Sequence, residues 1–132
     1  MNKGLYVHLP FCAAICHYCD FVKFIYQKGW INPYLKGLKQ DLAFFNVPED
    51  LHTIYVGGGT PTVLSYVELR KLLQLLAPYT KHVYEYTFEA NIESITPKKL
   101  ELMKEFGVNR LSIGVQSTND QRLHSLNRQH TY

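Results

Sequence analysis

The sequence predicts an α/β fold in which a parallel sheet is joined by helical crossovers. Short runs rich in β-branched and aromatic residues alternate along the chain with longer segments whose apolar residues recur at helical spacing. Repeated strand–helix steps of this kind favour a parallel sheet with right-handed connections. The length of 132 residues suits one domain and is too short for two ordinary ones.

Four segments have the composition of strands. Residues 5–9 alternate in polarity and stop at Pro10, and residues 53–56 stop at three consecutive glycines. Residues 84–89 form the third predicted strand. Residues 108–115 are largely apolar, which is typical of a strand buried on both faces of a sheet. Because helical patterns separate these segments, we expect neighbouring strands to run parallel.

The first two predicted helices have recognisable start signals. Asn32 and Pro33 are typical of an N-cap followed by the first helical residue, and the apolar spacing continues to Phe45. Ser65 and Glu68 are spaced as a capping box for a leucine-rich second helix. Both helices would follow a strand and return the chain to the sheet.

The third and fourth helices are shorter. Thr96 and Pro97 start the third, and Gly107 follows its end. Leu123 and Leu126 belong to a short helix near the end of the chain. In barrels built from such units, chemistry collects at the carboxyl ends of the strands, so we expect the polar motifs after each strand to converge there.

The composition indicates a globular protein and excludes several classes of function. The chain is 46% hydrophobic and 19% charged, with a net charge of +3. It has no block of Lys and Arg typical of nucleic-acid binding and no apolar run of the ~20 residues that span a membrane. It also lacks a signal-peptide pattern. Reduced, clustered cysteines then favour a cytoplasmic location.

All three cysteines lie in one short segment, at Cys12, Cys16 and Cys19. An odd number of thiols at this spacing predicts ligands of one metal centre rather than disulfides. Thiolates favour zinc, copper(I) or an iron–sulfur cluster. An alternative is a zinc loop completed by His8 or His17. A four-iron cluster is a further possibility, in which three cysteines would leave one iron open for another ligand.

This spacing resembles the signature of radical S-adenosylmethionine (radical SAM) enzymes. Motifs along almost the whole chain are similar to the oxygen-independent coproporphyrinogen III oxidase-like branch of that family: residues 5–12, 18–21, 57–62, 89–91, 107–117 and 126–131. The resemblance implies a [4Fe–4S] cluster, SAM, and the first half of a (β/α)6 partial barrel. It also implies heme or porphyrin as a partner.

The resemblance assigns roles to individual residues, and it marks none as catalytic. The cysteines would hold the cluster, with Tyr18 packed beside it. Tyr6, Gly58 and Glu89 would contact the first SAM. Four further residues would lie toward a second SAM or substrate pocket: Gly59, Thr60, Gln116 and Arg128. Independently, glycines let backbone approach a ligand closely, and a carboxylate at an apolar strand end needs a hydrogen-bonded partner.

The residue at position 21 distinguishes two branches of the family that this sequence resembles. The coproporphyrinogen dehydrogenase has a further cysteine at the position of Phe21, so the sequence resembles the heme-chaperone branch, which passes heme to apoproteins. The dehydrogenase and an inactive metal- or heme-binding fragment remain alternatives. Family members are several times longer, so we expect residues 1–132 to be the N-terminal part of a single radical SAM domain, without its later strands and C-terminal domain. No motif identifies the electron donor.

Overall fold

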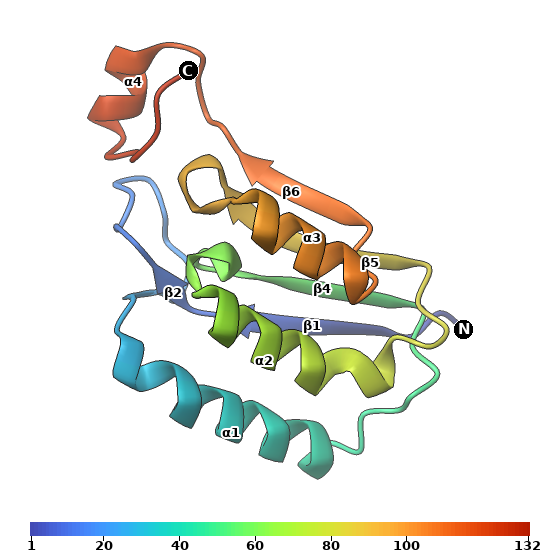
Figure 1. Ribbon diagram of the computed structural model, residues 1–132. Coiled ribbons are helices and arrows are strands. Elements are labelled where there is room, and N and C mark those ends of the chain that lie inside the picture. The colour runs from blue at the N-terminus through green and yellow to red at the C-terminus, as the bar shows by residue number, and fades with distance from the viewer.

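The computed structural model describes residues 1–132 and shows a parallel sheet with helices packed along one face (Figure 1). The strand order in the sheet is β1-β4-β5-β6. The strands are β1 (Gly4–Leu9), β4 (Thr53–Gly58), β5 (Glu85–Asn91) and β6 (Arg110–Gly114). The helices are α1 (Lys28–Phe44), α2 (Tyr66–Leu76), α3 (Pro97–Glu105) and α4 (Asp120–Ser125). The predicted α/β fold with helical crossovers is therefore confirmed.

The strand register gives the two faces of the sheet different chemistry. Side chains alternate between faces along a strand, and in-register parallel strands keep equivalent positions on the same face. Val7 pairs with Val56, Val56 with Phe88, and Phe88 with Leu111, which makes one face apolar. The neighbouring positions form a polar row on the opposite face: Tyr6, Tyr55, Thr87 and Arg110.

The helices α1, α2 and α3 lie against the apolar face and build the core. That core contains 19 buried residues drawn from the strands, from the inner sides of the helices and from the segments between them. In α2, the residues Leu69, Leu72, Leu73 and Leu76 are almost fully buried. Their spacing of three and four residues places them on one side of the helix, which faces the sheet. The polar face carries no helix (Figure 1).

The predicted caps of α2 and α3 are confirmed. The Ser65 hydroxyl accepts a hydrogen bond from the Glu68 amide at 3.2 Å, and Glu68 accepts one from the Ser65 amide at 2.8 Å. Glu68 also accepts from the Tyr26 hydroxyl at 2.9 Å, which ties the start of α2 to the segment before α1. At α3, Thr96 accepts from the Lys99 amide. These bonds satisfy amide groups that a helix start would otherwise leave free.

The predicted start of α1 is wrong. The helix begins at Lys28, with Gln27 as its N-cap, and Pro33 lies inside the helix. Ile31 is buried, and Trp30 packs edge-on against Phe24 with ring centroids 6.1 Å apart. Tertiary packing of these residues stabilises an additional turn before the proline, although a proline inside a helix removes a backbone hydrogen bond.

The expectation that the fourth strand is buried on both faces is also wrong. None of the residues of β6 is buried, because β6 lies at the edge of the sheet and contacts only β5. Its apolar composition therefore leaves Ile113 45% exposed. An unpaired, apolar strand edge is a surface to which another segment can add.

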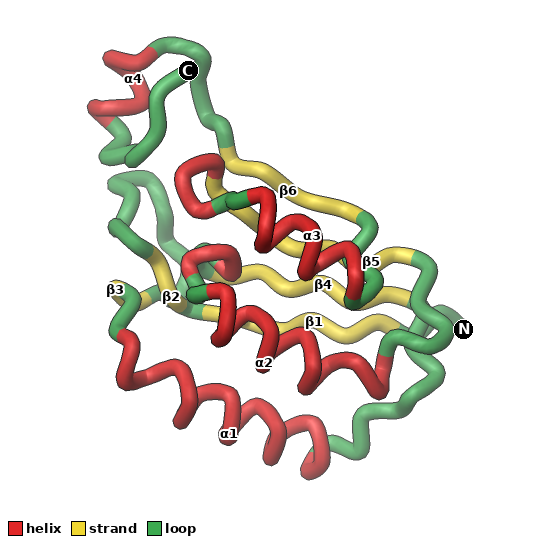
Figure 2. The backbone as a smooth tube through the Cα atoms, in the orientation of Figure 1, coloured by secondary structure: helices red, strands yellow, loops and turns green.

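The structure also contains short elements that the sequence did not predict. The two-residue strands β2 (Phe11–Cys12) and β3 (Phe24–Ile25) pair in parallel at the carboxyl end of the main sheet (Figure 2). The 3₁₀ turns η1 (Pro61–Val63), η2 (Ala77–Tyr79) and η3 (Ile92–Ser94) follow β4, α2 and β5, respectively. The segments that follow the main strands meet at the same end of the molecule as α4 (Figure 1). None of the helices is both long and apolar enough to span a membrane.

We predict that Leu72→Ala lowers the free energy of unfolding of the chain by about 2–5 kcal/mol, because it leaves a cavity under the sheet. Leu72 has no exposed surface. Urea denaturation followed by circular dichroism measures the change. Leu100→Ala is the control, because Leu100 of α3 is 37% exposed and should cost much less. Equal losses in the two variants would contradict this account of the core.

Candidate functional site

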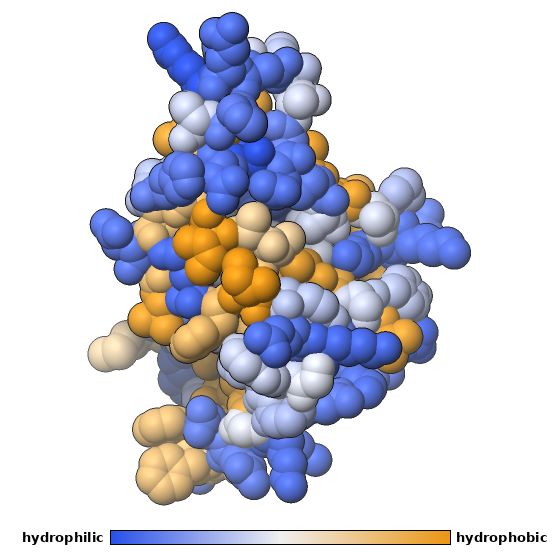
Figure 3. All heavy atoms as spheres, turned by 90° about the vertical axis from the view of Figure 1, so that its left-hand side faces the viewer, coloured by the Kyte–Doolittle hydropathy of each residue, from blue (hydrophilic) through white to orange (hydrophobic).

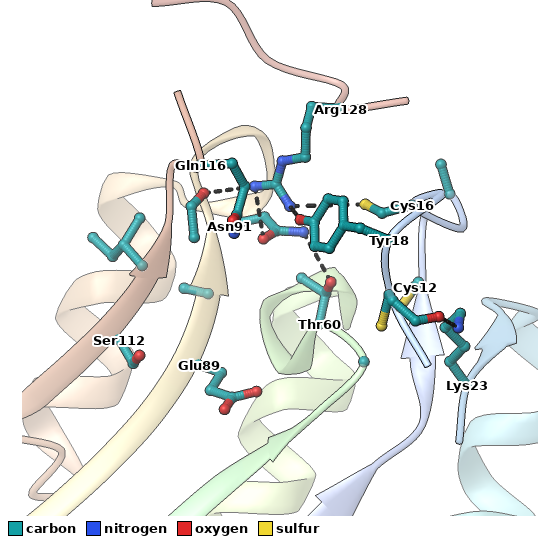
Figure 4. Close-up of a pocket in the computed structure, with 16 residues that line it drawn as sticks. Cys12, Cys16, Tyr18, Lys23, Thr60, Glu89, Asn91, Ser112, Gln116 and Arg128 are labelled. Atoms are coloured by element: carbon teal, nitrogen blue, oxygen red, sulfur yellow. Dashed lines mark hydrogen bonds between the residues drawn. The ribbon is translucent and has the colours of Figure 1, made fainter. Parts of the chain in front are cut away.

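A pocket of about 340 Å³ lies at the carboxyl ends of the strands. Its lining comes from all four main strands or the segments that follow them, and from the chain beyond α4 (Figure 4). Segments that are more than 100 residues apart in the sequence thus meet at one place, as Cys12 and Arg128 show. This convergence was predicted from the alternation of strands and helices, and it is confirmed.

The cysteine segment is anchored at both ends by backbone hydrogen bonds. The Phe24 amide donates to the Pro10 carbonyl, and the Tyr26 amide donates to the Cys12 carbonyl at 2.8 Å. Between these anchors, Lys23 donates from its ammonium group to the carbonyl of Cys19. The loop that contains Cys12, Cys16 and Cys19 is thereby closed on itself, and all three thiols line the pocket.

The cysteines differ in their surroundings. Cys12 is buried, whereas Cys16 and Cys19 are partly exposed. Burial raises the pKa of the Cys12 thiol, and a hydrogen bond with Thr60 acts in the opposite direction. Metal coordination requires the thiolate, so the neighbouring Lys23 charge also favours the coordinating form of Cys12.

The three thiols that line the pocket fit a four-iron cluster with one iron left open. No three His, Cys, Asp or Glu side chains surround a single point as one metal ion requires. A four-iron cluster binds each thiolate at a different iron, so its ligands surround a larger volume. Both histidines of the zinc alternative bond to backbone carbonyls. His8 bonds to the Val22 carbonyl at 2.9 Å, and His17 bonds to the Ser125 carbonyl at 3.1 Å.

The glycine run brings the end of β4 against the cysteine segment. The Gly59 amide donates to the Leu9 carbonyl at 2.8 Å, and the Thr60 amide donates to the Phe11 carbonyl at 2.7 Å. A Cβ atom on Gly59 would lie 2.5 Å from the Phe11 oxygen, so only glycine permits this approach. Gly58 has φ +115°, which also favours glycine. The glycines therefore position Thr60 and the backbone before Cys12.

Glu89 lies on the polar face of the sheet and lines the pocket. Its carboxylate accepts a hydrogen bond from the Tyr55 hydroxyl at 2.6 Å and one from the Gly58 amide at 3.1 Å. The Tyr55 pKa is raised by its hydrogen bond to this carboxylate and by burial. The two donors fix the orientation of the Glu89 carboxylate, which suits the binding of a cationic or amino group.

Arg128 closes the pocket from the opposite side. Its guanidinium donates to the Gly114 carbonyl at 2.5 Å, to Asn91 at 3.1 Å and to the Tyr18 hydroxyl at 3.1 Å. Asn91 in turn donates to the Thr60 hydroxyl at 3.0 Å. The pocket thus has an anion on one side and a cation on the other, which suits a zwitterionic ligand.

Most of the residues that the sequence pointed to line this pocket, and two do not. Gly58 reaches the site only through its bond to Glu89. Tyr6 lies in the middle of β1 on the polar face and outside the pocket lining. Its side chain is 57% exposed, and its hydroxyl is 2.9 Å from Nδ1 of His8. The remaining predicted residues are brought together: Cys12, Cys16, Tyr18, Cys19, Gly59, Thr60, Glu89, Gln116 and Arg128.

Sequence reasoning missed three polar residues and one glycine that also line the pocket, namely Lys23, Asn91, Ser112 and Gly114. Asn91 and Gly114 occupy the last positions of β5 and β6, which was an available signal. Gln116 follows β6 with φ +67°, an uncommon conformation for a residue with a side chain. Such backbone geometry occurs often at binding sites.

The surface around the cysteine loop includes an exposed apolar patch. Figure 3 faces this end of the molecule and shows hydrophobic side chains in the middle of the face, below a hydrophilic upper part. The exposed apolar residues of the loop and of its flanks include Phe21, which is 72% exposed, and Val22, which is 67% exposed. Exposed apolar side chains next to a pocket are typical of a surface that contacts a ligand or partner.

Comparison with known proteins gives a consistent family assignment. Residues 6–132 match the radical SAM superfamily. The chain is 43% identical to the heme chaperone HemW of Bacillus subtilis, over 97% of this chain and 35% of the relative. It is 39% identical to HemW of Lactococcus lactis, over 98% of this chain and 34% of the relative. The chain therefore spans about a third of the length of these relatives.

Solved structures agree with the sequence comparison. Coproporphyrinogen III oxidase (HemN) of Escherichia coli, a radical SAM enzyme, superposes with a TM-score of 0.83 at 28% identity, over 98% of this chain and 31% of HemN. Elp3 of Methanocaldococcus infernus superposes with a TM-score of 0.54 at 14% identity and supports the fold alone. Together with the cysteine loop and the parallel sheet, these matches establish that the chain belongs to the radical SAM superfamily, whose general cofactors are a [4Fe–4S] cluster and SAM.

Proposed function

We propose that this chain binds a [4Fe–4S] cluster through Cys12, Cys16 and Cys19 and binds SAM in the adjacent pocket. The observation that carries the proposal is the convergence of all three thiols with Glu89 and Arg128 on one pocket. Three thiolates leave one iron without a protein ligand, and that iron is available to SAM. Such a cluster, when bound and reduced, would supply the electron whose transfer to the sulfonium of SAM breaks its C5′–S bond.

In this proposal, different residues of the chain contact different parts of SAM. Glu89, fixed by Tyr55 and the Gly58 amide, would accept hydrogen bonds from the amino group of SAM. Tyr18 would pack beside the cluster and the nucleoside. We place Tyr6 and Gly58 with the first SAM through the resemblance to the family. Four residues would lie toward a second SAM or substrate: Gly59, Thr60, Gln116 and Arg128.

We further propose that the function lies in heme handling, as part of a heme chaperone that passes heme to apoproteins. Relatives at 43% and 39% identity are named heme chaperones. Phe21 occupies the position at which the dehydrogenase branch has a cysteine, so coproporphyrinogen dehydrogenase is disfavoured. Heme or a porphyrin would be the partner at the apolar surface around Phe21. In this proposal, residues 1–132 are one part of a single radical SAM domain.

The first prediction for the site concerns the cluster. Anaerobic reconstitution with iron and sulfide should give a brown protein with about four irons and four sulfides per chain, since all three thiols line one pocket. Replacing Cys12, Cys16 and Cys19 together by Ala should abolish the cluster. Iron and sulfide analysis with visible absorption measures both. Stoichiometric zinc uptake, without a cluster under any reducing condition, would falsify the proposal.

The second prediction concerns SAM. Glu89→Gln should weaken SAM binding to the cluster-loaded chain about tenfold or more, because it removes a charge-assisted hydrogen bond of about 1.5–3 kcal/mol. Anaerobic equilibrium dialysis measures the dissociation constant. Glu85→Gln is the matched control, since Glu85 lies on the same strand but pairs with Arg110 at the opposite end of the sheet. If the two variants bind SAM with equal affinity, Glu89 is not a SAM ligand.

The third prediction separates the heme-chaperone branch from the dehydrogenase. The cluster-loaded chain with SAM and a reductant should form no protoporphyrinogen from coproporphyrinogen, because Phe21 replaces the cysteine of that branch. Anaerobic incubation, with 5′-deoxyadenosine measured in parallel, tests this. Multiple turnovers of protoporphyrinogen would overturn the branch assignment. SAM binding without any cleavage would instead favour the alternative of an inactive binding fragment.

A further inference from the structure

One side chain of the pocket reaches a sulfur of the cysteine loop. Nη1 of Arg128 lies 3.8 Å from Sγ of Cys16, within the range of a hydrogen bond to sulfur, and the same nitrogen lies near the Tyr18 hydroxyl. Arg128 is only 9% exposed. A buried guanidinium beside a thiolate ligand acts on that ligand through both its charge and its N–H group.

The position of Arg128 is fixed by contacts that do not involve Cys16. The segment after α4 is attached to the cysteine loop through backbone groups. His17 bonds through Nδ1 to the Ser125 carbonyl at 3.1 Å and through its amide to the Leu126 carbonyl at 3.4 Å. Asn127 donates from its side chain to the Ile15 carbonyl at 2.8 Å. The guanidinium is therefore held beside the loop before any cofactor binds.

Arg128 forms no direct ion pair with a carboxylate. Its hydrogen-bond partners in the pocket are a carbonyl, an amide, a phenol and the sulfur of Cys16, and none of them is a carboxylate. The ion pairs of the structure involve Lys3, Arg110 and His130 instead. The carboxylate of Glu93 pairs with His130 at 3.5 Å and acts on Arg128 only over a longer distance. A buried cation without a carboxylate partner stabilises negative charge that develops nearby.

We propose that Arg128 acts through the sulfur of Cys16 on the proposed cluster and raises the reduction potential of that cluster. The inference rests on the proposed function, because it concerns the cluster that the three cysteines would hold. A cluster gains negative charge when it accepts one electron from an external low-potential donor. A cation and an N–H donor beside a ligating sulfur both stabilise this more negative state, and hydrogen bonds and net charge are known to set cluster potentials.

The test is a redox titration of the reconstituted chain without SAM, with the reduced cluster followed by electron paramagnetic resonance. We expect Arg128→Gln to lower the equilibrium constant for reduction by about tenfold, which corresponds to ~59 mV for one electron. Arg122→Gln is the control for net charge, because Arg122 is an exposed cation of α4. We expect its potential to match that of the wild type.

The outcomes separate this inference from the proposed function. A wild-type chain that takes up no cluster overturns both. A loaded wild type, with Arg128→Gln shifted no more than Arg122→Gln, overturns the role of Arg128 alone. If Arg128→Gln takes up no cluster, Arg128→Lys is titrated instead. Lysine keeps the positive charge but lacks the planar guanidinium group. We therefore expect Arg128→Lys to lower the reduction potential by less than Arg128→Gln would. An unchanged potential in loaded Arg128→Lys then overturns the inference.

Discussion

The site depends on the in-register pairing of the parallel strands. Val7, Val56 and Phe88 are register partners on neighbouring strands and point to the same face of the sheet. That apolar face is therefore continuous, and α1, α2 and α3 cover it (Figure 1). The same register directs Glu89 and Ser112 to the other face, side by side. A shift of one residue would exchange the two faces and bury the carboxylate under the helices, at a large cost in free energy. Core packing thus fixes the polar groups of the pocket.

Features set by local sequence were predictable, and those set by distant contacts were not. The capping box at Ser65 and Glu68 and the start of α3 at Thr96 depend only on neighbouring residues, and both were predicted correctly. The start of α1 was not, because its additional turn depends on packing between Trp30 and Phe24. The strand composition of β6 was recognised, but its position at the sheet edge is a property of the topology.

The same distinction applies to the site. The cysteine spacing and the glycine run predicted the pocket, and most of the assigned residues line it. The bonds between the cysteine loop and the segment after α4 span more than 100 residues, such as that from Asn127 to Ile15, and no local pattern contains them. Nor does the sequence indicate that Gly59 faces the Phe11 backbone. The roles of Glu89 and Arg128 in binding SAM stay proposals.

The central claim is that the three thiols hold a four-iron cluster with one iron open to SAM. Mössbauer spectroscopy of the chain reconstituted with ⁵⁷Fe tests it most directly, because it resolves irons that differ in coordination. The account predicts that adding SAM changes the isomer shift of a single iron while the other three keep their spectrum. Spectra in which no iron responds to saturating SAM, or in which all irons change together, would contradict the claim.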